Sequence, residues 1–206
     1  MPDSQARVSE RSRKISYEEF LEGCDEDSLA EWIDGDVVRV SPASRRHQAI
    51  SDFVLRVFGD YVEQRELGQV ISAPFQMKTG PHLGGREPDV LFVGREHLER
   101  LKETYLDGPA DLVVEVVSPE SRLRDRGEKL AEYEMGGVRE YWIIDAEKQQ
   151  ADFYLLGADG RYERKRTDAE GTYRSHVVPG FWLNERWFWQ EPLPRALSVL
   201  RELGVV

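Results

Sequence analysis

The chain has 206 residues, of which 40% are hydrophobic and 33% are charged, and its formal net charge at pH 7 is -11. This length allows one domain with a substantial core, and no apolar run is long enough to cross a bilayer. The acidic balance argues against general, sequence-independent binding of nucleic acid, because phosphate binding needs local positive potential. It does not exclude a magnesium-dependent enzyme, because the carboxylates that bind a metal themselves contribute to the negative net charge.

The N-terminal residues are polar and mixed in charge, so we expect a flexible arm over 1–15 and a single domain over 16–206. The chain has one cysteine, Cys24, which cannot form an internal disulfide. A chain without disulfides suits a reducing compartment, and we therefore expect a cytoplasmic protein without a membrane span.

Two local signals predict the first elements. Ser16 and Glu19 have the spacing of a capping box, which predicts a short helix that begins at Tyr17. The pair Asp34-Gly35 stands between two short apolar runs, and glycine tolerates the positive backbone angle of a tight turn. This pair therefore predicts a β-hairpin over 30–40.

After the hairpin, apolar residues recur at three- and four-residue spacing from Ser44, which predicts a long helix with Gly68 as its C-terminal cap. The rest of the chain carries further strand and helix patterns. Strands are predicted over 69–77, 89–93, 112–117 and 141–144, helices over 97–106, 125–135 and 195–203, and a meander of short strands over 151–156, 161–167, 172–178 and 186–189.

Two carboxylates occupy unusual places in these apolar strands. Asp89 follows Pro88 directly, and Glu115 stands in the middle of a run of valines. A buried carboxylate without a partner is costly, and a metal ion or a proton would remove that cost. If the two strands are neighbours, both carboxylates converge on one point, which is how an oxygen-rich magnesium or manganese site is assembled.

Other residues accompany these acids in a fixed order along the chain. They are Glu31 with the rest of 31–35, His47, Pro88 with Asp89, Glu115, Lys129, and the segments 137–145 and 175–181. In this order and spacing, the chain resembles the Uma family of restriction-endonuclease-fold proteins, a branch of the PD-(D/E)XK nuclease superfamily. The likeness runs along nearly the whole chain.

The resemblance implies an α/β fold of mixed α+β type with a restriction-endonuclease-like core, in which helices flank a central mixed sheet. To this core the chain adds the N-terminal hairpin and the C-terminal β-meander. The resemblance also implies a divalent metal, Mg2+ or Mn2+, at Asp89 and Glu115, and hydrolysis of phosphodiester bonds in nucleic acid. It does not identify the substrate, for which we expect DNA rather than RNA. Many enzymes of this fold act on two strands, so a homodimer is expected by analogy.

One position departs from the superfamily's simplest pattern, in which a lysine stands two places after the second acid, because that place is Val117. Lys129, on the helix predicted after this strand, is the candidate catalytic cation, since a lysine stem is long enough to reach back. Lys78 is the substitute. Glu31 is a candidate third metal ligand, and His47 is a candidate donor or proton carrier near the phosphate.

Each assignment also has an ordinary alternative. Asp89 can turn the chain after a proline, and Lys129 can pair with Asp125 or Glu132 on a solvated helix face. The missing lysine at position 117 and the acidic balance favour a second hypothesis for the whole chain. In that hypothesis the protein is a catalytically degenerate nuclease-like scaffold that serves binding or assembly.

Overall fold

The computed structural model describes residues 14–23, 30–33, 35–39, 43–80, 83–118 and 121–206. Most of the expected arm, and Cys24, lie outside the described residues. Ile15, the last residue of that arm, is attached to the hairpin. Its amide donates to the Gly35 carbonyl at 2.9 Å, and its carbonyl accepts from Trp32 Nε1 at 2.9 Å. The single domain over 16–206 stays a prediction.

The central sheet contains six strands: β3 (Gly68–Ser72), β6 (Val90–Gly94), β8 (Leu112–Val116), β9 (Glu140–Asp145), β10 (Gln150–Leu156) and β11 (Tyr162–Lys165). Their order across the sheet is β11-β10-β9-β8-β6-β3. Strands β8 and β9 are parallel, and the other neighbours are antiparallel. The parallel pair is buried along its whole length, as continuous apolar runs predict.

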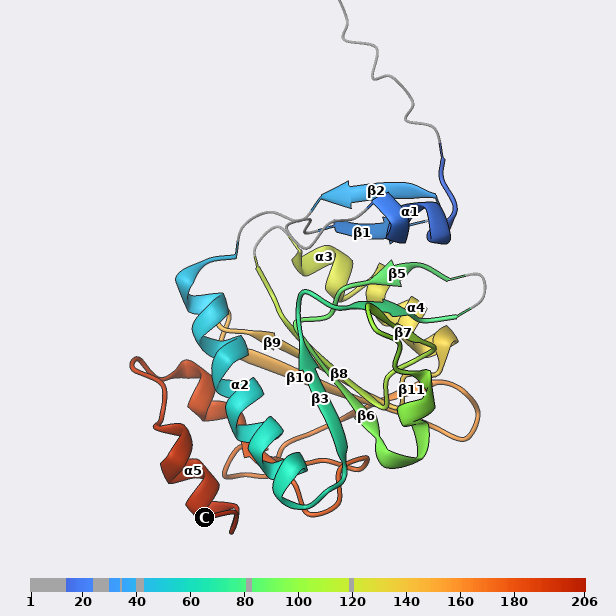
Figure 1. The fold of residues 1–206 in the computed structure, drawn as a ribbon. Helices are drawn as coiled ribbons and strands as arrows, with labels where there is room; N and C mark the ends of the chain where they lie inside the picture. Colours follow the sequence, from blue (N-terminus) through green and yellow to red (C-terminus); the bar gives the residue numbers. More distant parts are fainter. Residues whose placement is uncertain (1–13, 24–29, 34, 40–42, 81–82, 119–120) are drawn as a thin grey trace, which may run out of the picture.

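A second sheet contains β1 (Ala30–Ile33), β2 (Asp36–Arg39), β4 (Gln76–Lys78), β5 (Gly85–Arg86) and β7 (Tyr105–Asp107). Its order is β2-β1-β5-β4-β7. The hairpin β1–β2 lies at one end of the molecule, as Figure 1 shows. A third, two-stranded sheet pairs β12 (Thr172–Arg174) with β13 (Trp182–Asn184).

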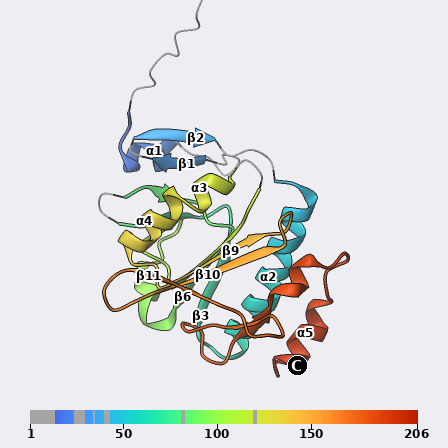
Figure 2. The ribbon, with the colours of Figure 1, turned by 180° about the vertical axis from the view of Figure 1, so that it is seen from behind.

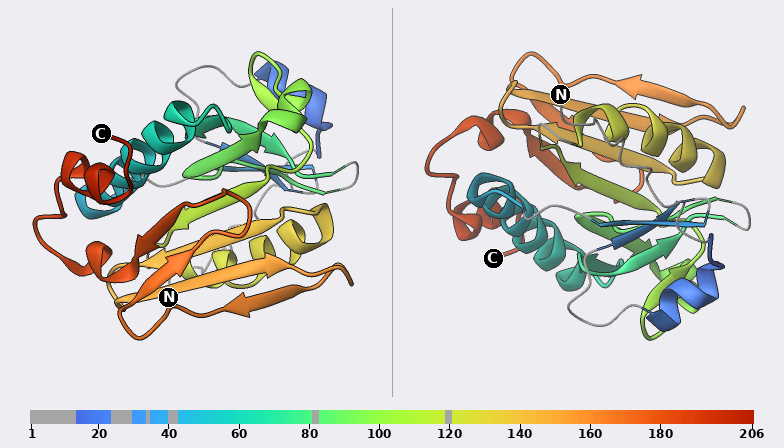
Figure 3. Two further views of the ribbon diagram at one scale, coloured as in Figure 1. Left: turned by 90° about the horizontal axis from the view of Figure 1, so that it is seen from below. Right: turned by 90° about the horizontal axis from the view of Figure 1, so that it is seen from above.

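The helices are α1 (Tyr17–Gly23), α2 (Arg45–Gln64), α3 (Arg122–Asp125), α4 (Glu128–Gly136) and α5 (Ala196–Glu202), with 3-10 helices η1 (Arg95–Arg100) and η2 (Glu185–Trp189). Helices α2 and α5 pack on one face of the central sheet, and α4 belongs to the other face (Figures 2 and 3). The chain thus has the predicted mixed α/β fold, with helices on both sides of a mixed sheet.

The first two local signals are confirmed. The Ser16 amide donates to Glu19 Oε2 at 2.9 Å, and the Glu19 amide donates to Ser16 Oγ at 3.1 Å, so both halves of the capping box form. In the hairpin Ile33 stands opposite Asp36, and Gly35 has a φ of 88°. A left-handed angle of this kind is what selects glycine in a two-residue turn.

The long helix is confirmed, but its predicted end is wrong. Ser44 is the N-cap, since its side chain accepts from the His47 amide at 3.1 Å. The helix ends at Gln64, with Arg65 as its C-cap. Gly68 instead opens β3 beside β6, where an added Cβ would lie 2.1 Å from the Val93 carbonyl oxygen. Close approach of two strands, and not a helix cap, explains this glycine.

Two predicted elements before Asp111 are corrected. The strand predicted over 69–77 is split into β3 and β4, which belong to different sheets. Pro74 lies between them and has no amide to continue a ladder. The helix predicted over 97–106 is the short η1 followed by β7, which pairs in parallel with β4. Pairing with a distant strand overrides the local helical pattern there.

Two later predictions are also corrected. The helix predicted over 125–135 is divided into α3 and α4 at Gly127, where an added Cβ would lie 2.7 Å from the Leu123 carbonyl oxygen. The meander is not continuous, because β10 and β11 extend the central sheet while β12 and β13 form their own. The strand predicted over 186–189 is the 3-10 helix η2.

The two faces of β8 separate as alternation predicts. Leu112, Val114 and Val116 join the core under α2, whereas Val113 joins the core under α4. Glu115 therefore points to the α4 side. In the part of the chain that the structure describes, no helix is both long and apolar enough to span a membrane.

Candidate active site

Asp89 and Glu115 come from neighbouring strands, as their predicted convergence requires. Strands β6 and β8 are antiparallel with Val90 opposite Val114, so Asp89 stands just before β6 beside the end of β8. The Val116 amide donates to Asp89 Oδ2 at 2.7 Å. One hydrogen bond thus fixes the Asp89 carboxylate against the strand that carries Glu115.

His47 reaches the same carboxylate from the start of α2. The Ser44 cap fixes the first turn of that helix, and His47 Nε2 lies 3.2 Å from Asp89 Oδ2. Burial lowers the pKa of His47, but the hydrogen bond and charge of Asp89 outweigh it, so this pKa is raised above its usual value. His47 Nδ1 is buried and has no hydrogen-bond partner among the described residues.

Lys129 is a buried lysine of α4, with only 4% of its surface exposed, and not a solvated helix residue. Its Nζ lies 2.8 Å from Glu115 Oε1, 3.0 Å from Glu31 Oε1 and 3.6 Å from Asp125 Oδ1. Burial alone would lower the pKa of Lys129, but these carboxylates raise it well above its usual value. The lysine is therefore held as a cation in contact with Glu115.

Tyr133 is a further contact of Glu115 that the sequence did not reveal. It lies one turn after Lys129 on α4, and its hydroxyl donates to Glu115 Oε1 at 2.9 Å. Burial is the largest influence on Glu115 and raises the pKa of this carboxyl, while Lys129 opposes that shift. Helical spacing from Lys129 was the one sequence signal for Tyr133.

Glu31 reaches the cluster from β1, across from α4. Its Oε1 faces Lys129 at 3.0 Å, and its Oε2 lies 3.2 Å from Arg86 and 3.8 Å from Arg124. Burial raises the pKa of Glu31, but Lys129 and Arg86 outweigh it and lower that pKa below its usual value. Arg86, also unforeseen, is fully buried and binds Glu132 through two nitrogens at 2.7 and 2.8 Å.

Residues 17–186 match the model of the Uma2 family, whose description is "Putative restriction endonuclease". The chain belongs to the Uma2 family. The family match confirms the resemblance drawn from the sequence and supports a nuclease. A crystal structure of "a putative nuclease belonging to DUF820 from Anabaena variabilis ATCC 29413" has the same fold, with a TM-score of 0.69 and 16% identity over 85% of this chain and 97% of that one. No curated protein matches the chain.

In this Uma2 chain, each of the two central carboxylates is only half engaged. Asp89 uses Oδ2 for the Val116 amide and His47, and Glu115 uses Oε1 for Lys129 and Tyr133. Among the described residues, nothing donates a hydrogen bond to Asp89 Oδ1 or to Glu115 Oε2. Two free carboxylate oxygens on adjacent strands suit the oxygen coordination that Mg2+ and Mn2+ prefer, so the donor set fits such an ion.

A different group is the sole set of three metal-type ligands whose atoms lie within 4.8 Å of one another in the described part of the Uma2 chain. It consists of Glu96 and His97 of η1 and of Asp111, which directly precedes β8. Asp111 already accepts from the Gly94 amide at 2.7 Å and from His97 Nδ1 at 2.9 Å, and Arg139 lies 3.5 Å away. These contacts account for the buried Asp111 without a metal.

Lys78, the substitute cation, is placed elsewhere. Its Nζ lies 3.6 Å from Glu18 Oε1 and 5.2 Å from the centre of the Tyr17 ring. It also lines a cavity of about 390 Å³ with residues that include Thr79 and Met135. Of the two lysines, the structure thus brings Lys129 to Glu115.

Proposed function

We propose that this Uma2 chain is a divalent-metal-dependent endonuclease that hydrolyses phosphodiester bonds in nucleic acid, with DNA favoured over RNA. One observation carries the proposal: Asp89, just before β6, lies beside the end of β8 that carries Glu115, and each of the two keeps a carboxylate oxygen free of hydrogen bonds from the described residues. The Uma2 family match supports a nuclease independently.

The contacts support the following residue roles. Asp89 and Glu115 would hold Mg2+ or Mn2+ through their free oxygens. Glu31 is the proposed third acid of that site, and because its two oxygens face Lys129 and Arg86, it would have to release one of these cations to reach a metal. The metal, when bound, polarises the phosphate and lowers the pKa of an attacking water. Lys129 keeps its charge beside Glu115 and steadies negative charge on the phosphate. His47, bonded to Asp89, is the proposed proton carrier.

The test is cleavage of labelled DNA and RNA with magnesium, with manganese and without either metal. We expect metal-dependent cleavage by the natural chain, and the Asp89→Ala variant should lose it because one of the proposed metal ligands is gone. Asp60→Ala, which removes an exposed acid of α2, is the matched control and should retain activity. Wild-type activity in the Asp89→Ala protein would contradict the assignment.

A second function has a specific observation in its favour. Lys129 already faces three carboxylates, those of Glu31, Glu115 and Asp125, so the cluster is partly neutralised without a metal. A degenerate scaffold that serves binding or assembly would be stable with this arrangement. Calorimetric titration with manganese separates the two functions, because heat that disappears in Asp89→Ala and Glu115→Ala supports the nuclease and its absence in the natural chain supports the scaffold.

A further inference from the structure

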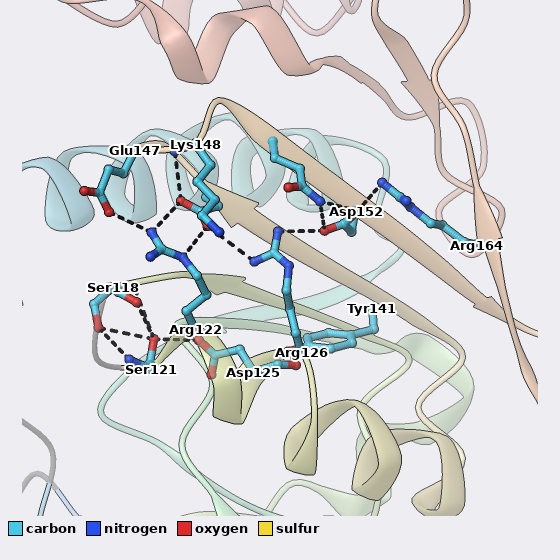
Figure 4. A network of polar contacts seen from close by, with 12 residues as sticks. Ser118, Ser121, Arg122, Asp125, Arg126, Tyr141, Glu147, Lys148, Asp152 and Arg164 are labelled. Carbon is cyan, nitrogen blue, oxygen red and sulfur yellow. Dashed lines mark hydrogen bonds and ion pairs between the residues drawn. The ribbon is translucent and has the colours of Figure 1, made fainter.

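Three arginines occupy the short segment that runs through α3, and two of them anchor it to the central sheet. Arg122 binds Asp145 at 2.8 and 3.2 Å, and Arg126 binds Asp152 at 2.7 Å and Asp145 at 3.4 Å. Figure 4 shows these side chains reaching the ends of β9 and β10. Because both acids are buried, the pairs fix the position of α3 firmly.

Arg124, between the two anchors, has a different environment. Its guanidinium makes no hydrogen bond with any described residue, and its one ion pair is a long contact of 3.8 Å between Nη1 and Glu31 Oε2. Its Nε is buried and without a partner, although 27% of the side chain is exposed. A guanidinium is rarely left without hydrogen bonds in a protein, so the part of this one that is exposed is open to a partner from outside.

The direction of Arg124 identifies the kind of partner. The long contact with Glu31 places the guanidinium beside the carboxylate that holds Lys129. Arg124 therefore lies beside Glu31 at the edge of the site described above, with 27% of its side chain exposed, on a segment that its two neighbouring arginines anchor. A guanidinium presents parallel N–H donors in one plane, a geometry that matches two oxygens of a phosphate. Its hydrogen bonds to a charged phosphate are stronger than those to a neutral acceptor.

We propose that Arg124 binds a backbone phosphate of the nucleic acid at the proposed active site, with Arg122 and Arg126 as the anchors that hold it in place. This inference rests on the proposed function. It assigns to Arg124 a substrate contact and to its two neighbours a structural one, although all three arginines lie within five consecutive residues.

The experiment measures binding of a short fluorescein-labelled DNA duplex, and of the matching single strand, by fluorescence anisotropy over a range of salt concentrations. Calcium replaces magnesium to prevent cleavage. Arg124→Gln is compared with Arg56→Gln, which removes the same charge from an exposed position on α2. Arg124→Lys keeps the positive charge but removes the paired N–H donors of the guanidinium. Thermal melts confirm that each variant is folded.

We expect Arg124→Gln to raise Kd about tenfold to a hundredfold, as loss of a charge-assisted hydrogen bond does. The slope of log Kd against log salt should fall by about 1, because one phosphate contact is lost. Arg124→Lys should keep the slope and bind less tightly than the natural chain. A purely structural arginine would change the melting temperature without changing the slope.

The proposal is overturned if Arg124→Gln matches Arg56→Gln in both Kd and salt slope while the natural chain binds and cleaves, and the proposed function then stands. If the natural chain binds neither duplex nor single strand, the proposed function and the role of Arg124 both fail. A loss of affinity with an unchanged salt slope would also overturn the proposal, since it would assign Arg124 to the internal ion cluster.

Discussion

At the scale of single residues, two buried glutamates on adjacent strands differ in how many of their carboxylate oxygens accept hydrogen bonds. Glu140 of β9 uses both carboxylate oxygens, whereas Glu115 of β8 uses one. A buried carboxylate whose two oxygens both accept hydrogen bonds stabilises the fold, whereas one with a free oxygen can still bind a metal or a proton. The donors to Glu140 are Trp142 Nε1 at 2.7 Å, Tyr173 OH at 2.9 Å, Ser175 Oγ at 3.0 Å, and the amides of His176 at 3.0 Å and Val177 at 2.9 Å.

These contacts explain why the segments 137–145 and 175–181 both contribute to the family resemblance. The first supplies the buried acceptor and the second supplies donors to it. Nothing in either segment alone indicates the pairing, because the two are separated along the chain by the strands β10, β11 and β12. The sequence therefore predicted the motifs but not their physical connection.

We predict that Glu140→Ala lowers the free energy of unfolding by about 3 kcal/mol or more, because it leaves several buried donors without an acceptor. Urea unfolding, monitored by tryptophan fluorescence, measures the change. Glu202→Ala removes an exposed acid of α5 and should change stability by less than about 0.5 kcal/mol. Equal stability of the two variants would show that the network around Glu140 is not stabilising.

Tyr133 supports a second prediction at this scale, which depends on the proposed metal site. Tyr133→Phe removes the hydroxyl from Glu115 Oε1 and keeps the ring packed 4.9 Å from that of Tyr141. With the oxygen less firmly held, manganese affinity measured by calorimetry should fall about tenfold, as for other residues that orient a metal ligand. Unchanged manganese affinity would assign Tyr133 to packing alone.

At the scale of elements, α3 and α4 show where local patterns were insufficient. Apolar spacing over 125–135 predicts one helix, but the helix is interrupted at Gly127, where the Leu123 carbonyl oxygen leaves no room for a Cβ. The break turns α3 toward the sheet, where its arginines meet buried acids of β9 and β10. Those acids lie beyond α4 in the sequence, so no local pattern predicts the ion pairs.

The anchoring of α3 predicts how stability depends on pH. Burial raises the pKa of Asp145, but its hydrogen bonds and ion pair with Arg122 outweigh burial and lower that pKa below its usual value. A carboxyl whose pKa is lower in the folded state stabilises the fold above its unfolded pKa and loses this contribution as pH falls through the folded pKa.

We therefore expect the difference in unfolding free energy between the natural chain and Asp145→Asn to be constant near neutral pH. It should shrink as pH falls below about 4, where the unfolded carboxyl takes up its proton. Denaturant titrations at a series of pH values measure this difference. A difference that grows on acidification would show that Asp145 does not bind Arg122 as an ion.

At the scale of the whole molecule, the candidate site is assembled from five separate parts of the chain. The hairpin supplies Glu31, the start of α2 supplies His47, the residue before β6 is Asp89, β8 supplies Glu115, and α4 supplies Lys129. A net charge of -11 is compatible with nucleic acid because the cations are placed at the site. The geometry of the site therefore depends on the complete fold.

We also predict a homodimer, by analogy with enzymes of this fold that act on two strands. Light scattering coupled to gel filtration should give about twice the chain mass of 23.8 kDa. A single-chain mass at every concentration would contradict this prediction without affecting the assignment of Asp89 or Glu115.

By itself, the sequence determined the local elements whose causes are local: the capping box at Ser16, the turn at Gly35 and the amphipathic α2. It also determined which two carboxylates are anomalous, because Asp89 directly precedes an apolar strand and Glu115 stands inside one. Strand alternation further fixed the face of β8 on which Glu115 lies.

Only the tertiary structure decided what those carboxylates contact. Lys129 is a buried cation and not a solvated one, and one of its contacts is Glu31, from a hairpin distant in the sequence. Arg122 and Arg126 bind buried acids of the sheet, whereas Arg124 between them makes no hydrogen bond with a described residue. Desolvation and charge pairing depend on distances between residues far apart in the chain, and folding alone sets those distances.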